Sequence, residues 1–180
     1  MLLRMETMSI TEIAFMTEEE TAESCELISM PQPIRTITSK PLTLAGRNKT
    51  YAIGPQPEMK AQWESFMSDF GKIDGQIGFN AYGVCHAFDG KGQMDYMCAV
   101  EVKDAGQVPG YLHTLQIPAR KVAVFLHQGP LDTISQTWMK IFNDWLPKAK
   151  LEVAHGPQFE IYGEAFNAGK EEVEIVIPVK

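Results

Sequence analysis

The sequence predicts an α+β domain that is a pseudo-twofold duplication of a β-α-β-β unit. Two main helices are expected against an antiparallel sheet, with a central ligand cleft on the symmetry axis. Three observations support this fold: short motifs that return in the same order, two amphipathic helical segments and two closing hairpins. The composition agrees, because 44% of the 180 residues are hydrophobic and 22% are charged, as in ordinary globular proteins.

The repeat is carried by short motifs that return in the same order, two of them 78 residues later and the third 75 residues later. RTI at Arg35–Ile37 returns as HTL at His113–Leu115. The dipeptide at Ala87–Phe88 returns with the same spacing at Ala165–Phe166. A Gly-Pro dipeptide followed by a tryptophan also occurs once in each half. The order strand, helix, strand, strand therefore occurs twice.

Each half contains one segment with apolar residues at spacings of three and four, which is typical of an amphipathic helix. The first segment begins near Met59 and is predicted to stop at Gly71. The second begins at Pro130, a favoured first-turn residue, and is predicted to stop before Pro147. Most aromatic residues of these stripes are predicted to be core residues.

A hairpin is predicted after each helix. In the first, the strands YGVCHAF and QMDYMCAVEV are joined by the turn DGKG. In the second, FEIYGEAF and KEEVEIVIPV are joined by NAG, with Gly169 in a left-handed position. Each unit is too small to cover both faces of its own sheet, so the two halves are expected to associate about a twofold axis.

The chain divides into an extension and one domain. Residues 1–29 include the acidic stretch TEEETAES and are expected to form a weakly ordered N-terminal extension. Residues 30–180 are expected to form the domain, with halves at about residues 33–104 and 108–180. The extension is too short for a helix-turn-helix domain.

The charge pattern limits the classes of partner. A net charge of -7 without clustered Lys and Arg argues against nucleic acid and favours a cationic partner. No apolar run has the length of a membrane span and no secretion signal begins the chain, so a cytoplasmic location and no membrane partner are expected. The scattered His and Cys residues lack ligand spacing, so no metal or cofactor is expected.

Glu160 is the main candidate for a functional residue. It lies between Phe159 and Ile161 in a strand, where alternation alone fits either a solvent-facing residue or a buried carboxylate. The repeat spacing matches Glu160 with Tyr82, so an acid and a phenol are expected to face one cleft. A carboxylate in an apolar cleft favours a delocalised organic cation, which costs less to desolvate than Lys or a metal ion.

Aromatic residues are expected to form the wall of this cleft. Their faces attract a bound cation by roughly 0.5 to 2 kcal/mol each. The candidates beside Glu160 are Tyr82, Tyr162 and Trp138, with Tyr51 and Phe142 behind them.

The chain resembles a known family in two segments. VPGYLHTLQIPARKVAVFLHQGPL at Val108–Leu131 and the closing FEIYGEAF and VEIVIPV are similar to the GyrI-like family, the effector-binding domain of AraC-type and MerR-type transcription regulators that sense drugs. The resemblance covers about residues 33–180. It implies that a buried glutamate, here Glu160, binds the positive charge of lipophilic drugs. It also implies a second acid in the last strand, here Glu174, while the aromatic residue that often follows is Val176.

Three functions of different classes remain open. The first is a stand-alone module that binds cationic, amphipathic aromatic compounds for drug sensing or sequestration. The second is a small-molecule hydrolase in which Glu160 activates water and Tyr82 or Tyr162 assists. The third is a protein-interaction module, as in gyrase-inhibiting members of the family. The first is favoured because one carboxylate lies in an aromatic setting without a second catalytic partner, so no catalytic residue is assigned. A homodimer or a protein partner also stays open.

Overall fold

The computed structural model describes residues 33–54 and 56–180, so the expected extension at residues 1–29 lies outside the described residues. The strands are β1 (Pro33–Thr38), β2 (Leu42–Ala52), β3 (Gln76–His86), β4 (Gln93–Val102), β5 (His113–Ile117), β6 (Lys121–Gln128), β7 (Gln158–Tyr162) and β8 (Glu172–Pro178). The α-helices are α4 (Glu58–Met67), α5 (Ile134–Lys140), α6 (Leu146–Ala149) and α7 (Glu164–Asn167). Short helical turns are η1 (Ala105–Gln107), η2 (Leu131–Thr133) and the π-helical turn η3 (Ile141–Trp145).

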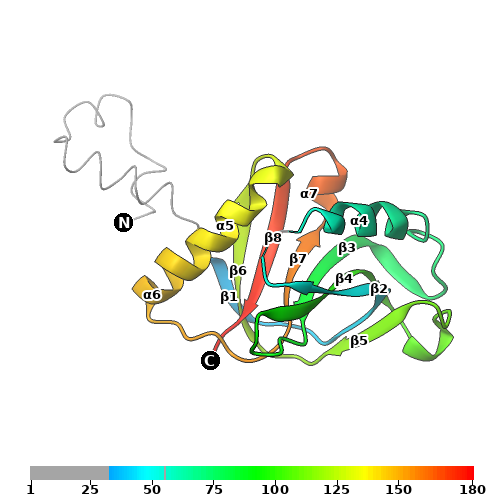
Figure 1. Ribbon diagram of the computed structural model, residues 1–180, viewed down its shortest axis with the longest axis horizontal. Helices are drawn as coiled ribbons and strands as arrows, with labels where there is room; N and C mark the ends of the chain where they lie inside the picture. The colour runs from blue at the N-terminus through cyan, green and yellow to red at the C-terminus, as the bar shows by residue number, and fades with distance from the viewer. Residues whose placement is uncertain (1–32, 55) are drawn as a thin grey trace. The chain divides into compact units, whose positions relative to one another are not determined.

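The eight strands form one antiparallel sheet in the order β1-β6-β8-β7-β3-β4-β2-β5 (Figure 1). Read outward from the central pair, β3-β4-β2-β5 on one side corresponds to β7-β8-β6-β1 on the other. This α+β architecture confirms the predicted fold class, while the duplication itself stays a prediction.

Each half has two strands before its helix, whereas one was predicted. The motifs RTI and HTL lie in these additional strands, β1 and β5. Strand β1 pairs with β6 of the other half, and β5 pairs with β2 of the other half. The two strands form the edges of the sheet, where each pairs with one neighbour. Sequence periodicity could not assign them because their partners are remote in the chain.

The face of the sheet that carries the helices, called here the helix face, buries two hydrophobic clusters. Helix α4 covers β2, β3 and β4, and α5 with the turns that follow covers β6 and β8 (Figure 1). The α4 cluster has the buried residues Ala45, Tyr51, Phe66, Ile73, Tyr96, Cys98, Val100, Val102 and Leu112. The α5 cluster has the buried residues Ala123, Phe125, Ile141, Leu146, Ile175, Ile177 and Val179.

The opposite face, called here the inner face, buries a third cluster. Its members come from both ends of the strand order, including Leu44 of β2 and Val122 of β6. All buried members of this cluster belong to strands, so the sheet covers its own inner face by curving around it. The buried members are Leu44, Tyr82, Val84, Met97, Ala99, Ile117, Val122, Val124, Phe159 and Val176.

Gln62 anchors α4 to the sheet. Its side chain is buried, and its Oε1 accepts a hydrogen bond from the Tyr51 hydroxyl at 2.9 Å. Its Nε2 donates to the backbone oxygens of Arg47 at 2.7 Å and Tyr96 at 3.0 Å. A buried amide with satisfied donors and acceptor specifies one position for the helix, because any displacement would leave polar atoms unpaired.

The second helical segment continues past Pro147, which corrects the predicted stop. After the π-helical turn, Pro147 lies in the first turn of α6, and the segment ends where Lys150 adopts a φ of 55°. A proline in a first turn is tolerated because the missing N–H has no intrahelical acceptor there. Neither this segment nor any other helix of the described residues is long and apolar enough to cross a membrane.

The first strand of the second hairpin is shorter than predicted. Strand β7 ends at Tyr162, and GEAF forms α7 after an extended Gly163. The helical turn places the Phe166 ring edge-on against the Tyr162 ring, with centroids 5.2 Å apart. The strand pattern thus gives way to a helical turn that packs these two half-buried rings together. Gly169 has a φ of 82°, as the predicted turn requires.

Candidate functional site

Glu160 lies at the centre of the sheet on its helix face. It is the middle residue of β7 and pairs with Gly83 of β3, so the two residues share one face. Its side chain is only 8% exposed. Of the two readings that strand alternation permits, the structure therefore has the buried carboxylate.

Both oxygens of the Glu160 carboxylate accept hydrogen bonds from neutral groups. The Trp138 indole Nε1–H of α5 donates to Oε1 at 2.7 Å. The Tyr162 hydroxyl donates to Oε2 at 2.8 Å. None of the salt bridges formed by the described residues includes Glu160. The carboxylate is therefore hydrogen-bonded on both oxygens without a cation paired to it in the described part of the chain.

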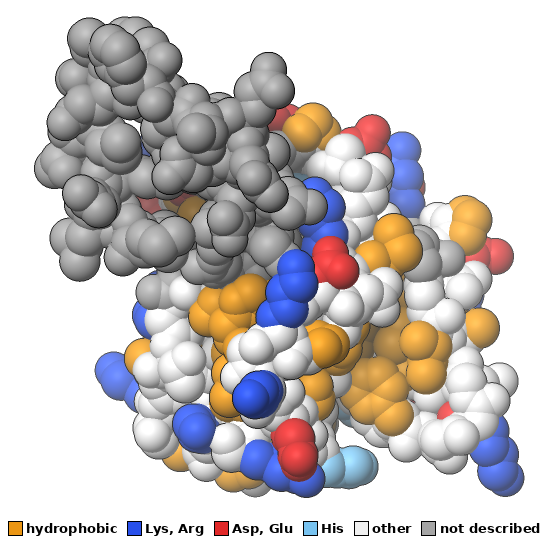
Figure 2. Space-filling model, turned by 90° about the vertical axis from the view of Figure 1, so that its left-hand side faces the viewer, with side chains coloured by type: hydrophobic (Ala, Val, Ile, Leu, Met, Phe, Trp, Pro, Cys, Tyr) orange, Lys and Arg blue, Asp and Glu red, His pale blue; other side chains and the backbone are white. Residues whose placement is uncertain are grey.

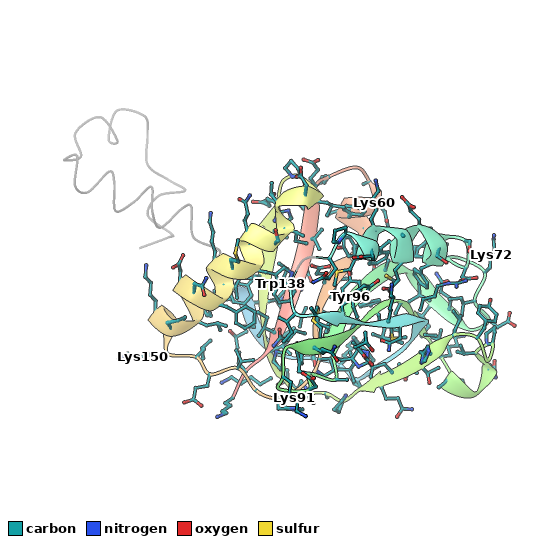
Figure 3. All side chains as sticks on the ribbon, viewed as in Figure 1. Lys60, Lys72, Lys91, Tyr96, Trp138 and Lys150 are labelled. Atoms are coloured by element: carbon teal, nitrogen blue, oxygen red, sulfur yellow. The ribbon has the colours of Figure 1, made fainter. Side chains whose placement is uncertain are left out.

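The carboxylate has room because its cross-strand neighbour is glycine. A Cβ atom on Gly83 would lie 2.5 Å from the Tyr96 hydroxyl oxygen and 2.8 Å from Glu160 Oε2. The Tyr96 oxygen is in turn held by the Trp63 Nε1–H of α4 at 3.0 Å. Figure 3 shows Trp138 on α5 and Tyr96 on β4 on either side of β7. The absent side chain thus opens the space that the acid and the phenol share.

Aromatic rings from both helices surround the carboxylate. The Trp63 ring meets the Tyr162 ring edge-on at 5.2 Å, so Tyr162 lies between Trp63 and Phe166. The Trp138 ring stacks on Phe142 at 6.1 Å with an interplanar angle of 10°. Phe142 is 38% exposed. Hydrophobic side chains also gather on the face of the molecule that Figure 2 shows. The aromatic wall therefore extends from the buried acid to the surface.

Burial controls the ionisation of the site. Desolvation raises the pKa of Glu160, and the hydrogen bonds from Trp138 and Tyr162 and the nearby His127 partly oppose this shift. Desolvation followed by the Glu160 charge raises the pKa of the Tyr162 hydroxyl well above its usual value, and that of the Tyr96 hydroxyl likewise. Both phenols are thus neutral donors at physiological pH.

His127 links the end of β6 to the middle of α5, next to Trp138. The ring is 2% exposed, and its Nε2 lies 3.1 Å from the Gly129 oxygen and 3.3 Å from the Pro130 oxygen. Carbonyl oxygens only accept, so Nε2 carries a hydrogen. Its Nδ1 lies 2.8 Å from the Thr137 hydroxyl, next to Trp138. The histidine therefore ties the end of β6 to the helix that supplies the indole donor.

Tyr82 does not face Glu160, which corrects the expectation that they face one cleft. Tyr82 pairs with Ile161, so it points to the inner face, where it is 3% exposed and its ring lies 6.3 Å from that of Phe159. In a strand, the residue beside one that faces the helices points to the other face. The sequence match between the halves therefore does not bring these two side chains together.

Glu174 and Tyr51 also lie away from the carboxylate. Glu174 pairs with Ile161, so it belongs to the inner face, where it forms a salt bridge with Arg35 at 2.7 Å. Tyr51 is on the helix face but lies under α4, and its ring meets Tyr96 edge-on at 6.5 Å. The structure brings together Glu160, Trp138, Tyr162 and, behind Trp138, Phe142.

Four residues of the site were not singled out from the sequence: Trp63, Gly83, Tyr96 and His127. A signal existed for Trp63, because the internal repeat matches it with Trp138. No local pattern identifies Gly83 or Tyr96, since their roles depend on strands that pair across the sheet.

Two hollows on the surface lie apart from Glu160. One, of about 480 Å³, lies along β2 and α4, and the other, of about 510 Å³, includes Phe70, Phe79 and Glu164. Within the part of the chain that the structure describes, no group of three His, Cys, Asp or Glu side chains could hold a metal ion. Glu160, at 8% exposed, lines neither hollow and lies among the aromatic rings.

Comparisons with known proteins give one consistent result. The GyrI-like small molecule binding domain family matches residues 32–180. The transcriptional regulator BrlR of Pseudomonas aeruginosa is 31% identical over 124 residues, which are 65% of this chain and 44% of BrlR. The chain thus spans less than half of that relative.

Solved structures share the fold. SAV2435 bound to tetraphenylphosphonium is 24% identical, with a TM-score of 0.65 over 81% of this chain and 93% of that chain. A putative transcription regulation protein from Staphylococcus aureus is 25% identical, with a TM-score of 0.61 over 81% of this chain and 97% of that chain. The C-terminal domain of EcmrR is 16% identical, with a TM-score of 0.56 over 81% and 96%.

Proposed function

Because the chain belongs to the GyrI-like small molecule binding domain family, we propose that it binds lipophilic, cationic aromatic compounds at Glu160. The observation that carries this proposal is the buried carboxylate whose hydrogen-bond partners, among the described residues, are the neutral donors Trp138 and Tyr162. Neutral donors satisfy the hydrogen bonds of the carboxylate but do not neutralise its charge. A positively charged ligand should therefore bind at this site with a more favourable free energy than a neutral ligand of the same size.

The chemistry around the acid favours an organic cation. Each carboxylate oxygen has a further lone pair beyond its one hydrogen bond. The rings of Trp63, Trp138 and Tyr162 present faces and edges for an aromatic ligand, and their faces attract positive charge. A cation with dispersed charge enters this setting at a lower desolvation cost than an ammonium group. One charge and flat apolar surfaces demand no particular shape, so broad specificity is expected.

A relative supports this ligand class. Tetraphenylphosphonium, bound in SAV2435, is a lipophilic aromatic cation of the kind proposed here. BrlR is a transcriptional regulator, which agrees with a sensing role for a small-molecule binding domain. We therefore propose drug sensing or sequestration as the biological use of the site.

Ligand entry requires one aromatic ring to move, because the acid is 8% exposed. Tyr162 contacts both Trp63 and Phe166, whereas the Trp138 ring contacts one other ring among the described residues, that of the exposed Phe142. The ligand therefore displaces the Trp138 ring. The positive charge of the ligand then lies beside Oε1, where the indole N–H donated before.

A titration tests the proposal. Tetraphenylphosphonium and a fluorescent cationic dye should bind saturably and compete, while uncharged tetraphenylmethane analogues of similar size should bind more weakly. Equal affinity for charged and uncharged ligands, or no saturation up to about 1 mM, would overturn it. Mass spectrometry of the protein mixed with a cationic dye that carries an ester tests the hydrolase alternative, because a hydrolase would release the acid and the alcohol.

A further inference from the structure

The second half of β2 has a strand neighbour on one side only. Strand β4 pairs with β2 from Leu44 to Ala52, whereas β5 pairs with it only from Leu42 to Gly46. Within the described part of the chain, residues 47–52 therefore form an open sheet edge. Open edges are sites where another chain can add a strand.

Backbone groups on this edge are available for pairing. In an antiparallel pair, the N–H and C=O groups of alternate residues point to opposite sides. The Ile53 N–H donates to the Gly92 oxygen, on the β4 side, at 2.9 Å. Because Ile53 faces β4, Tyr51 and Lys49 face β4 as well. The backbone groups of Thr50 and Asn48, which lie between them, therefore point to the open side. No loop or side chain of the described residues bonds to these groups.

Helix α4 makes the open edge one wall of a groove. The hollow of about 480 Å³ lies between the edge and α4, near which β2 runs in Figure 1. On the helix it is lined by residues that recur at spacings of three and four and so form one stripe: Glu58, Ala61, Gln62 and Ser65. Tyr111 and His113 close the end where β5 begins. A sheet edge beside a helix is a geometry that accepts an extended peptide.

The charges of the sheet wall indicate the chemistry of the peptide. Arg47 is paired with Asp69 at 2.8 Å. Lys49 is exposed and lies 5.0 Å above the Tyr51 ring, and no carboxylate of the described residues pairs with it. An added strand would place a side chain directly beside Lys49, where an acidic residue is favoured over a basic one.

We propose that this groove binds an extended peptide segment of a partner protein, which adds to β2 as a further strand with an acidic side chain beside Lys49. The segment pairs its backbone with Asn48 and Thr50, and its apolar side chains contact Tyr51 and Ala61. The site is separate from Glu160, so the proposal goes beyond small-molecule binding and does not depend on it.

The test uses the full chain and two acetylated hexapeptides of alternating Thr and Val with a central Glu or a central Lys. Fluorescence anisotropy should give saturable binding of the Glu peptide, about tenfold tighter than the Lys peptide. Amide hydrogen exchange should slow at residues 47–52 when the Glu peptide is added. Absence of binding by the Glu peptide, or protection that maps elsewhere, would overturn the proposal.

Variants distinguish strand addition from other binding. Thr50→Pro removes the N–H on the open edge, whereas Thr50→Val keeps the N–H and loses the same hydroxyl, which bonds Asp95. The Kd of the Glu peptide should be about tenfold higher for Thr50→Pro than for Thr50→Val. Equal binding by the two would overturn strand addition.

If Thr50→Pro does not fold, reversing the charge at Lys49 still tests whether the peptide binds with an acidic side chain beside this residue. Lys49→Glu should prefer the Lys peptide over the Glu peptide, because the charges are then reversed. An unchanged preference would overturn the assignment of the acidic side chain. Cationic dye binding should be the same in these variants and in the parent chain, since Glu160 is not altered.

Discussion

The indole N–H of Trp138 donates to Glu160 Oε1 at 2.7 Å and so joins α5 to the centre of the sheet. On the other side, Tyr162 donates to Oε2 at 2.8 Å. The acid thus lies between a helix packed on β6 and β8 and a strand paired with a neighbour on each side. Substitutions can change separately the charge of Glu160, its hydrogen bonds and the space beside it.

Removal of the charge alone should weaken cation binding. In Glu160→Gln, Oε1 still accepts from Trp138, and the Tyr162 hydroxyl can turn to accept from the new amide. Affinity for cationic dyes should fall by roughly 1.5 to 3 kcal/mol, about tenfold to a hundredfold in Kd, while neutral analogues change little. Calorimetric titration checks this, and equal dye affinity in both proteins would contradict the role of the charge.

The same substitution should change how stability depends on pH. Because desolvation raises the pKa of Glu160 in the folded state, its contribution favours folding below the unfolded pKa and is lost as pH rises through the folded pKa. At neutral pH, Glu160→Gln should therefore be as stable as the parent chain or more stable. Thermal melts from pH 4 to 8 measure this, and a large loss of stability confined to the variant would contradict it.

Cation affinity should also depend on pH, with the opposite sign. Binding needs the ionised acid, so affinity should be full above the raised pKa of Glu160 and fall as pH drops through it. Trp138→Phe removes a hydrogen bond that lowers this pKa, so the midpoint should move to higher pH. Trp145→Phe is the matched control, because Trp145 packs on Phe125 and makes no bond to Glu160. Equal midpoints in all three proteins would contradict the assignment.

The two faces of the sheet should respond differently to the same substitution. Tyr162→Leu removes an aromatic ring beside the acid, so cation affinity should fall by up to about tenfold. Tyr82→Leu alters the inner face, so affinity should stay unchanged although core packing is disturbed. Dye titration of both variants, with circular dichroism to confirm folding, measures the difference. Equal losses would show that the site reaches through the sheet.

The space above Gly83 should tolerate no side chain. In Gly83→Ala the added Cβ would lie 2.5 Å from the Tyr96 oxygen and 2.8 Å from Glu160 Oε2, so both groups must shift. We expect a loss of about 1 to 3 kcal/mol in the free energy of unfolding. Gly110→Ala is the control, because a Cβ there meets no atom within 4 Å. Urea unfolding compares the two, and equal stability would contradict the role given to Gly83.

Residues 1–29 are expected to be dispensable for folding. They contribute little apolar periodicity in the sequence, so a chain that begins at Met30 should melt within a few degrees of the full chain. Differential scanning calorimetry of both chains measures this. A large drop in Tm would show that the segment stabilises the domain or an assembly.

Elements with a strong local pattern could be predicted from the sequence. Helix α4 has apolar residues at spacings of three and four, and β4 is an apolar run bounded by turn residues, so nearby residues carry both signals. The continuation of the second helix through Pro147 and the short helix α7 could not be predicted in this way. A π-helical turn and the contact between Phe166 and Tyr162 decide them, and both depend on packing.

The sequence by itself determined the fold class and identified Glu160 as the acid in an aromatic strand. The tertiary structure alone decided which side chains meet it. The alternation along the strand predicts that Phe159 and Ile161 face away from Glu160. It does not predict which strand pairs with β7 or in which register. The register of β3 against β7 pairs Glu160 with Gly83 and Ile161 with Tyr82. The repeat matches Glu160 with Tyr82, so the observed pairing differs from that match by one residue. This difference places a glycine beside the carboxylate and Tyr82 on the inner face, because neighbouring side chains in a strand point to opposite sides.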